Sequence, residues 1–586
     1  ASDDESVSMR DRHSLRIWLF PLLLLLGVST AIFLLTFWID TGGDFSKLAL
    51  LGHPNPESAA NAIASAGEVV AAVLGIAITV VAIIVELASN RYTHRVTELF
   101  VGEPINFLVM GFFVVTALQA VFVAVTFDHA AVELLRADGT PLHEASGFVP
   151  YLSLTVALCM LAFSLLILLP YFAFVFEFLS PIQIVDRIRR YSLRAITRGA
   201  TATNVRQRQL EAIRGVEQLA DVGLNAMENK DKGVSMASVD ALRAMATDYQ
   251  GIRAGLGEGW FRVEGELAHN PDFVSMSPDV LSAVTRRRIW FEMKVLRKYQ
   301  TLYNEALNKM RDINYLIAIN TRLIAETALE RKNHELFEMV VKFFNTFLRA
   351  TVNARDVRTA YNVLNQYRLL GERCLHEDGG RTAVEIARYF KYYGLVSFHA
   401  KLPFILETVA YDLCALNELA YDQGSPVHRE LLRIFLQVDK ESESDVQEVS
   451  LRGVRKAQCK LATHYLVSGS EDLAREIYRD MESERHDRLA SIRDELLGVR
   501  SAEFWEISDR GVNFDYLSPA RKRELLTFFG WFEGLPDPSL SILPNDPDQL
   551  PEPSAAEVHQ AESPRRRPRS SDSTLHDIPG AGVDPS

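Results

Sequence analysis

The side chains best suited to chemistry lie inside an apolar segment near the N-terminus. Glu68 and Glu86 are 18 residues apart. That separation is about five turns at roughly 3.6 residues per turn, so both carboxylates project from one side of a helix. Small and polar residues lie close to the same line: Asn61, Gly75 and Thr79. Ionisable groups within a membrane segment are costly in lipid and normally face a partner or water, so this polar stripe is the strongest candidate for a functional surface.

Two arrangements would give the side chains of this polar stripe a favourable environment within a membrane. Small residues at seven-residue spacing let helices approach closely, so the stripe can be a helix–helix interface with both carboxylates near the membrane surfaces. Alternatively, it lines a water-filled path around the axis of an oligomer, where rings of carboxylates favour cations. On another apolar segment, Gln119 and its neighbour Thr116 can extend either arrangement through hydrogen bonds between helices.

Four apolar runs must position these side chains, and each is long enough for the about 20 helical residues that cross a bilayer. The runs are residues 17–39, 60–86, 105–127 and 148–179. The first lacks a small-residue cleavage pattern and is too long for an ordinary signal-peptide core, which favours an uncleaved anchor. Pro170 predicts a kink in the last. We expect a transmembrane domain over residues 15–182, after a short segment, 1–14.

The basic residues beside these runs predict the orientation. They gather before the first run, between the second and third, and after the fourth: Arg10, Arg12, Arg16, Arg91, Arg95, Arg187, Arg189, Arg190, Arg194 and Arg198. The other two loops hold only Lys47 and Arg136. Under the positive-inside rule, both termini are cytoplasmic. The five arginines after the fourth run either anchor that span or contact anionic lipid headgroups.

Residues Glu86–Arg95, with the sequence ELASNRYTHR, resemble a Leu-Ala-Ser-Ser-Gln-Phe/Tyr-Ser-Pro-Arg signature. That signature belongs to a family of uncharacterised bacterial predicted membrane proteins. The segments Ser180–Gln183 and Gly215–Asp221 add to the resemblance, which covers roughly residues 15–300, whereas Glu228–Lys232 replaces the family's Asn-Asp-Pro turn. The resemblance implies four spans, a cytoplasmic domain and a place in the bacterial plasma (inner) membrane. It implies no settled activity.

The remainder of the chain has the period of α-helices, with apolar residues at three- and four-residue steps. We expect a juxtamembrane and long-helix region over 183–330, in which Arg287–Leu329 forms one long helix or two nearly continuous ones. Helical hairpins follow over 331–535, the clearest being Val454–Met481, which resembles a tetratricopeptide repeat. Less regular hairpins are expected around Thr359–Cys374 and Thr382–Ala400. Trp260–Val263 is the best of few strand signals.

The fold class is therefore all-α. We expect a four-helix transmembrane domain followed by a helical-repeat, solenoid-like domain, which we prefer to a closed bundle. Residues 536–586 are rich in Pro, Ser, Asp and Glu and predict a disordered tail.

Several classes of function are disfavoured. A formal net charge of −13 disfavours a nucleic-acid binder, which needs a basic face. The four cysteines form no C-x-x-C pair, no histidine lies at metal-ligand spacing, and no nucleophile elbow or phosphate loop occurs. We expect no catalytic residue, metal or cofactor.

Two non-enzymatic functions remain. The first is a homo-oligomeric channel-like or transport protein, in which the polar stripe lines a path and the cytoplasmic helices assemble or gate it. The second is a membrane-anchored scaffold or adaptor whose helical repeats bind a protein partner.

Overall fold

Helices joined by short turns make up the described part of the chain. The computed structural model describes residues 56–91, 97, 100–101, 103–130, 151–199, 204–438, 448–503 and 510–538, and these ranges contain no β-strand. The predicted span at 17–39, the N-terminal arginines and nearly all of the predicted tail lie outside the described residues.

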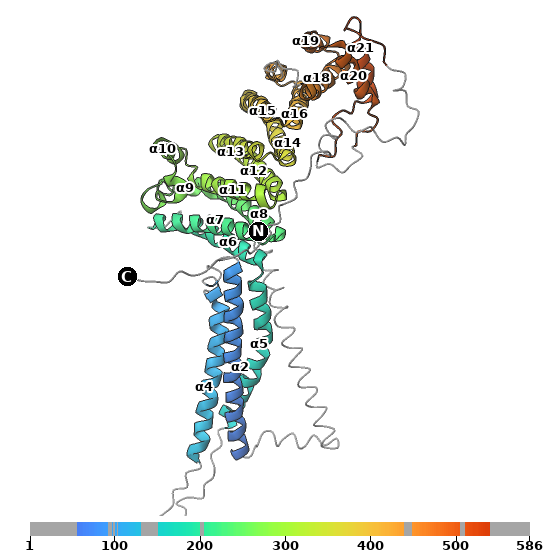
Figure 1. The fold of residues 1–586 in the computed structure, drawn as a ribbon. Coiled ribbons are helices and arrows are strands. Elements are labelled where there is room, and N and C mark those ends of the chain that lie inside the picture. Colours follow the sequence, from blue (N-terminus) through green and yellow to red (C-terminus); the bar gives the residue numbers. More distant parts are fainter. Residues whose placement is uncertain are drawn as a thin grey trace, which may run out of the picture.

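Three long apolar helices lie side by side at one end of the molecule (Figure 1). They are α2 (Pro56–Arg91), α4 (Pro104–Ala130) and α5 (Tyr151–Phe178), and Pro170 lies within the last. Each contains a segment long and apolar enough to cross a membrane: Asn61–Ser89, Pro104–Ala124 and Leu152–Phe178. These segments correspond to the second, third and fourth predicted spans.

One face of α2 packs against α4 and α5. Its buried residues recur at steps of seven, four and three: Ile63, Val70, Ala77, Val81, Val85 and Ala88. Because such steps return to the same side of a helix, they mark a single packed face. Val70, Val81 and Val85 pack with Phe113, Leu161 and Val175 of the other two helices, and Ile63 belongs to a second small apolar cluster with Ala120 of α4 and Leu154 of α5.

A proline ends the third span and begins the next helix. A proline disfavours the helical conformation of the residue before it, so α5 ends at Phe178 and α6 (Pro181–Gly199) starts at Pro181 in a new direction (Figure 1). In α6, Ile184, Ile188 and Ile196 are buried. This helix lies across one end of the spans and joins them to the rest of the chain.

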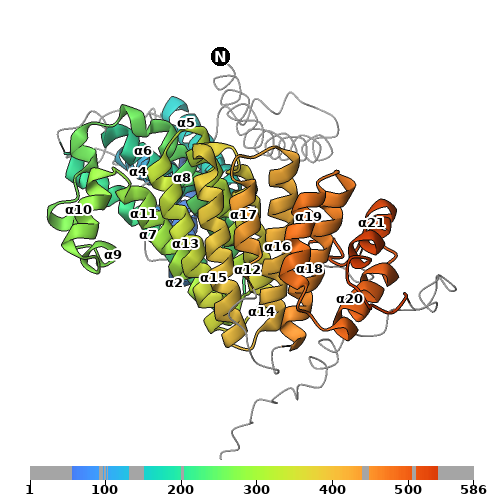
Figure 2. The same ribbon diagram turned by 90° about the horizontal axis from the view of Figure 1, so that it is seen from above.

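Beyond α6 the helices form two layers, and as far as α17 each helix packs on a sequence neighbour in the other layer (Figures 1 and 2). We call this the helical stack. The first layer contains α6, α8 (Lys232–Ile252), α12 (Asp312–Glu330), α14 (Val357–Arg373), α16 (Pro403–Asp422), α18 (Glu448–Val467) and α21 (Pro519–Phe529). The second layer contains α7 (Val205–Glu228), α11 (Trp290–Lys309), α13 (His334–Asn353), α15 (Arg381–His399) and α17 (His428–Phe435).

The stack has one continuous hydrophobic core. It runs from Ala88 and Ile184 beside the membrane helices to Phe532 at the far end, without a break near residue 330. Smaller elements complete the stack: α9 (Pro271–Val274) and α10 (Pro278–Arg286) precede α11, while α19 (Glu471–Met481) and α20 (His486–Gly498) follow α18. This layered arrangement agrees with the expected all-α, solenoid-like class.

Arg287–Leu329 forms two helices separated only by residues 310–311, which agrees with the second of the two predicted alternatives, although α12 turns back onto α11 at Met310. Two other local predictions were wrong. Thr359–Cys374 and Thr382–Ala400 are not hairpins, since each is essentially one helix, α14 and α15. Trp260–Val263 is not a strand.

In place of a strand, Trp260 and Phe261 end a short 3-10 helix, η3 (Glu258–Phe261), and are buried against the stack rather than paired in a sheet. By contrast, Val454–Met481 does form the predicted helix pair, α18 and α19, with Gly469 at a φ of 79° in the turn. The likeness of this pair to a tetratricopeptide repeat stays a prediction.

A strap crosses the first layer near the end of the chain. Helices α20 and α21 touch, yet 20 residues, 499–518, separate them. Within that connection, Arg510 pairs with Asp412 of α16 at 2.5 Å, and the ring of Phe514 stacks on Tyr411 at 4.7 Å between centroids. Residues 510–518, called the strap, thus lie over α16 rather than taking a short route.

Candidate functional site

The five residues of the predicted polar stripe lie on one exposed side of α2. Asn61, Glu68, Gly75, Thr79 and Glu86 are all exposed among the described residues. A side chain added at Gly75 would meet no atom within 4 Å. We call these five residues the α2 stripe.

The α2 stripe points away from α4 and α5, which pack against the opposite side of the helix. Val70, Val81 and Val85 on that side are only 1–5 % exposed. The Thr79 hydroxyl donates to the carbonyl of Gly75, one turn earlier, at 2.8 Å. Neither Glu68 nor Glu86 has a hydrogen-bond or ion-pair partner within the described ranges. The stripe is therefore not an interface among these three helices.

Small residues do bring α2 close to α4, but on another flank. A Cβ at Gly67 would lie 3.2 Å from the Cβ of Ala120. Gln119, beside Ala120, is half-buried, and the buried hydroxyl of Thr116 donates to the carbonyl of Phe112 at 2.8 Å. Thr116 is thus satisfied within its own helix, and the predicted hydrogen bonds between helices remain a prediction for Gln119.

A polar junction fastens the membrane helices to α6. Arg187 forms an ion pair with Glu103, just before α4, and its guanidinium lies 4.0 Å from the ring centroid of Phe178. Nearby, the hydroxyl of Tyr171 donates to Asn106 at 3.2 Å. Burial lowers the pKa of Arg187 and the Glu103 carboxylate opposes that effect. These contacts tie the ends of α4 and α5 to α6.

The five arginines predicted to contact lipid divide into two groups. Arg189 pairs with Asp186 and with Asp248 of α8, and Arg190 also pairs with Asp186, so these two and Arg187 have partners within the protein. Arg194 and Arg198 are exposed and have no ion-pair partner in the described part of the chain. Headgroup contact remains a prediction that best suits these two.

Two residues of the segment Gly215–Asp221 have clear structural roles. A Cβ at Gly215 would lie 1.6 Å from the hydroxyl oxygen of Ser192 in α6, so only glycine allows this close crossing of α6 and α7. Glu217 accepts a hydrogen bond from the buried Lys294 of α11 at 2.6 Å. Both contacts hold α7 in place between α6 and α11.

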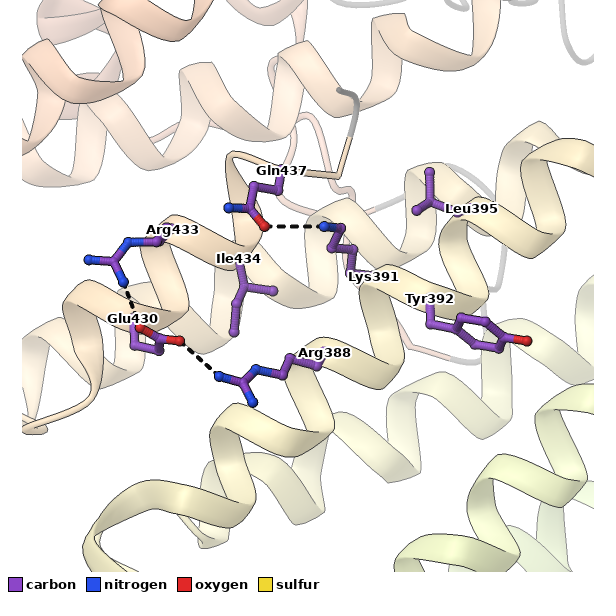
Figure 3. Close-up of a pocket in the computed structure, with 8 residues that line it drawn as sticks. All are labelled: Arg388, Lys391, Tyr392, Leu395, Glu430, Arg433, Ile434 and Gln437. Atoms are coloured by element: carbon purple, nitrogen blue, oxygen red, sulfur yellow. Dashed lines mark hydrogen bonds and ion pairs between the residues drawn. The ribbon is translucent and has the colours of Figure 1, made fainter. Parts of the chain in front are cut away.

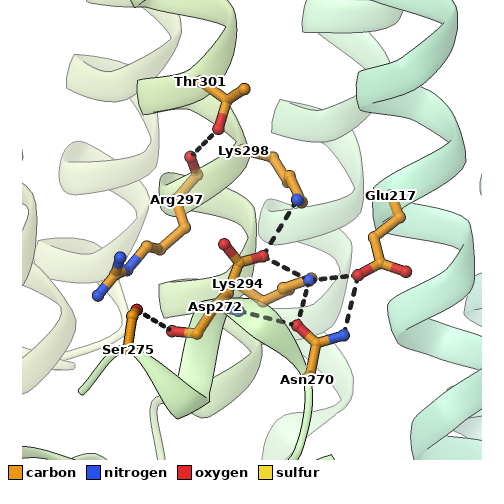
Figure 4. A network of polar contacts seen from close by, with 8 residues as sticks. All are labelled: Glu217, Asn270, Asp272, Ser275, Lys294, Arg297, Lys298 and Thr301. Carbon is orange, nitrogen blue, oxygen red and sulfur yellow. Dashed lines mark hydrogen bonds and ion pairs between the residues drawn. The ribbon is translucent and has the colours of Figure 1, made fainter. Parts of the chain in front are cut away.

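Lys294 is the centre of a buried polar network (Figure 4). Its side chain is fully buried, and its ammonium also donates to Asn270 at 2.8 Å and to Asp272 at 2.5 Å. An ammonium has three N–H donors, so every one has an acceptor. Although burial raises the pKa of Asp272, hydrogen bonds from Lys294 and Lys298 hold it below its usual value. The network fastens the segment before α11 to α7.

Glu292, two residues before Lys294, is also completely buried but lacks such partners. Neither of its carboxylate oxygens accepts a hydrogen bond from another described residue, and the nearest cation atom, Nε of Arg253, is 3.9 Å away. Burial raises the pKa of Glu292 to about 7, against the lowering effect of Arg253. The sequence did not indicate that Glu292 and Lys294 are buried charges, because both lie among apolar residues at core positions of α11.

Metal-binding clusters are absent from the residues that the structure describes, and the four cysteines are unpaired. Cys374, Cys414 and Cys459 are buried, whereas Cys159 lies on the exposed side of α5.

Comparison with known proteins adds one finding. A family model described as a predicted membrane protein (DUF2254) matches residues 14–254, from the first predicted span to the end of α8. No curated protein and no solved structure matches the chain significantly. The finer signature at Glu86–Arg95 stays a prediction. Residues 14–254 of this chain are therefore similar to the DUF2254 family of predicted membrane proteins, whose function is unknown.

Proposed function

We propose that the protein is a non-enzymatic, homo-oligomeric membrane protein in which α2 of neighbouring copies lines a channel-like path for cations. The observation that carries the proposal is the exposed α2 stripe. Glu68 and Glu86 lie on the side of α2 that α4 and α5 leave uncovered.

The energetic argument concerns what faces those carboxylates. A charged side chain at the centre of a bilayer costs about 2.5–3.5 kcal/mol on insertion scales. Glu86 lies near one end of the apolar segment Asn61–Ser89 and Glu68 lies about two turns in from the other end, where the penalty is smaller than at the centre, and the small residues between them leave room. Water around an oligomer axis would remove the penalty and give a path with a carboxylate ring near each end.

The helical stack would assemble or gate such a path. It is joined to the spans through α6 by the Arg187–Glu103 ion pair and by Ala88, the residue of α2 that reaches the core of the stack. In this proposal the stack and both termini lie in the cytoplasm of a bacterial plasma membrane, and Arg194 and Arg198 face the anionic headgroups.

Ion flux into liposomes tests the proposal. We expect cation-selective flux with the wild-type protein, reduced or made unselective by Glu68→Gln and Glu86→Gln. Glu177→Gln is the matched control, because Glu177 is an exposed carboxylate near the end of α5 and lies off the stripe. Absence of flux, or flux unchanged by both stripe substitutions, would contradict the proposal.

Cysteine cross-linking in membranes tests the oligomer separately. In a Cys159→Ala background, Thr79→Cys should form disulfides between copies, because the stripes face one another around the axis. Val81→Cys, which is 3 % exposed and packed against the other helices, should not. If Thr79→Cys gives no link between copies, the predicted span at 17–39 of the same chain becomes the better candidate for covering the stripe.

A membrane-anchored scaffold is the second candidate. It is supported by the length of the stack, whose helices extend far from the membrane helices (Figure 1). Cross-linking of the full-length protein in cells should then recover a specific protein partner bound to the stack, and recovery of none would count against it.

A further inference from the structure

A basic groove separates α15 from α17 in the second layer of the stack (Figure 3). Its volume is about 480 Å³. The lining residues are Arg388, Lys391, Tyr392 and Leu395 of α15 and Glu430, Arg433, Ile434 and Gln437 of α17. Three of these side chains are cationic and one is anionic, in a chain whose net charge is −13.

The contacts of Glu430 show how the groove binds a carboxylate. One oxygen of Glu430 pairs with Arg388 from across the groove at 3.0 Å, and the other pairs with Arg433 at 2.9 Å. A guanidinium has five N–H donors, so each arginine keeps donors for a second acceptor. The Arg388 and Arg433 side chains are 64 % and 68 % exposed, which leaves those donors open to a ligand.

The rest of the groove combines a further cation with apolar surface. The ammonium of Lys391 donates to Gln437 at 3.1 Å and retains two more N–H groups. Leu395 and Ile434 line the groove, and Tyr392 is 51 % exposed beside them. This combination suits a peptide that carries both carboxylates and an apolar side chain.

The basic surface continues onto the neighbouring helix α13. The hydroxyl of Tyr393 donates to the carbonyl of Asn345 at 2.7 Å, so this part of α15 lies beside the second half of α13. Lys342 and Arg349 are exposed there, and Arg349 interacts with Tyr393. Neighbouring helix axes are about 8–10 Å apart, so cations on three helices span roughly 20 Å. An extended chain of about six residues has that length.

We propose that this basic surface, formed by Lys342, Arg349, Arg388, Lys391 and Arg433, binds an extended acidic peptide segment of a protein partner. The spread of cations over three helices favours a peptide over a small carboxylate. Glu430 in the middle of the groove and the acidic balance of the chain disfavour a nucleic acid. The proposal rests on the scaffold function and is independent of a path along α2.

Peptide binding to the full-length protein in phosphatidylcholine nanodiscs tests the proposal. The probe is a fluorescent octapeptide of Asp and Glu with one central Leu, followed by anisotropy. We expect saturable binding that weakens as salt is raised, and about tenfold weaker binding for the double variant Arg388→Ala/Arg433→Ala. The same peptide with Asn and Gln in place of its acids should not bind.

One further variant serves as a matched control, and another should bind the peptide more tightly than wild type. Arg429 lies on the same helix with nearly the same exposure, but it pairs with Asp472 and Glu476 of α19, so Arg429→Ala should bind like wild type. Glu430→Gln removes the competing carboxylate, so it should bind the peptide several-fold more tightly. Circular dichroism confirms that each variant is folded.

Four outcomes of the binding measurements would overturn the proposal. They are no saturable binding to the wild type, equal loss in the Arg429 and groove variants, no gain with Glu430→Gln, and displacement of the peptide by an equally charged oligonucleotide at equal concentration. The scaffold function fails separately. If the groove variants still cross-link to a specific partner in cells, the scaffold stands and this groove is not its docking site.

Discussion

Helices α2 and α11 both carry charged side chains where charge is costly, and they deal with it differently. On α11, Lys294 is fully buried and each N–H of its ammonium reaches an acceptor, either on α7 or in the segment before α11. On α2, Glu68 and Glu86 have no partner among the described residues and lie on an uncovered side. The first arrangement is complete within one chain. The second needs something outside the three described spans.

This difference separates structural charges from candidate functional ones. A buried charge with all its partners stabilises one arrangement of helices and has no capacity left for a ligand. An exposed charge on a membrane helix has that capacity, because water, an ion or another helix must still meet it. Glu292 is intermediate, since it is buried without a hydrogen-bonding neighbour and can lose its charge by taking up a proton.

The largest expected effect comes from breaking the complete network. Lys294→Met leaves Glu217 and Asp272 partly buried without their shared cation, and should destabilise the stack by about 3–5 kcal/mol. Chemical unfolding of the detergent-solubilised protein, followed by tryptophan fluorescence, measures the change. Lys298→Met is the control, because Lys298 is 21 % exposed and its ion pair is with Asp272, at 3.1 Å. Equal losses in the two variants would show that the network does not stabilise the stack.

The next effect concerns pH and Glu292. Its pKa is about 7 in the folded protein and near 4.5 when unfolded, so the folded state binds the proton more tightly. Stability should therefore fall as pH rises from about 4.5 to about 7 and stay level above, by roughly 3 kcal/mol in total. Glu292→Gln should remove this decline, and be more stable than wild type at pH 8.

Glu407 needs a parallel measurement, because burial and then Asp515 raise its pKa to about 7 as well. Unfolding curves of the wild type, Glu292→Gln and Glu407→Gln between pH 5 and 8 separate the two contributions. If Glu292→Gln keeps the full wild-type slope, Glu292 is charged in the folded protein.

A smaller effect is expected where the two regions meet. Arg187→Gln removes the ion pair with Glu103 and the contact with Phe178, and should lower stability by about 1 kcal/mol. Thermal unfolding in detergent measures it. Arg190→Gln is the comparison, since Arg190 is 47 % exposed and its one ion pair among the described residues is with Asp186, so the loss of stability should be close to zero. An equally large loss of stability for Arg190→Gln would show that the contacts of Arg187 are not the main link between α6 and the membrane helices.

The smallest effect on stability is expected on α2. Glu68→Gln and Glu86→Gln should change the unfolding free energy of the solubilised protein by less than about 0.5 kcal/mol, because neither carboxylate has a partner to lose. The same unfolding measurement applies. A loss above about 1 kcal/mol would mean that the stripe already has a structural partner, and the contrast with α11 would disappear.

Apolar patterns were sufficient to predict the all-α class, three of the spans and the side of α2 that carries Glu68 and Glu86. They did not predict which side of α2 packs against α4, because Gly67 and Gly75 are equally small. Only the structure shows that Gly67, and not Gly75, lies against a side chain of α4, that of Ala120. The turn at Met310 was missed since nothing in its flanking residues breaks the helical period. The network at Lys294 was hidden because its acceptors are up to 77 residues away in the chain.

The strap has a consequence for how the chain reaches this form during synthesis. Arg510 donates to the carbonyl of Tyr361, 149 residues earlier, and pairs with Asp412. At about 5–20 residues per second, those 149 residues take on the order of 10–30 s to translate. Until then the ion-pair partner of Asp412 among the described residues is Arg368, at 3.3 Å, and Tyr411 lacks the ring of Phe514. Helices α14 and α16 can thus form early, but their shared surface is completed only when residue 510 and its neighbours have left the ribosome.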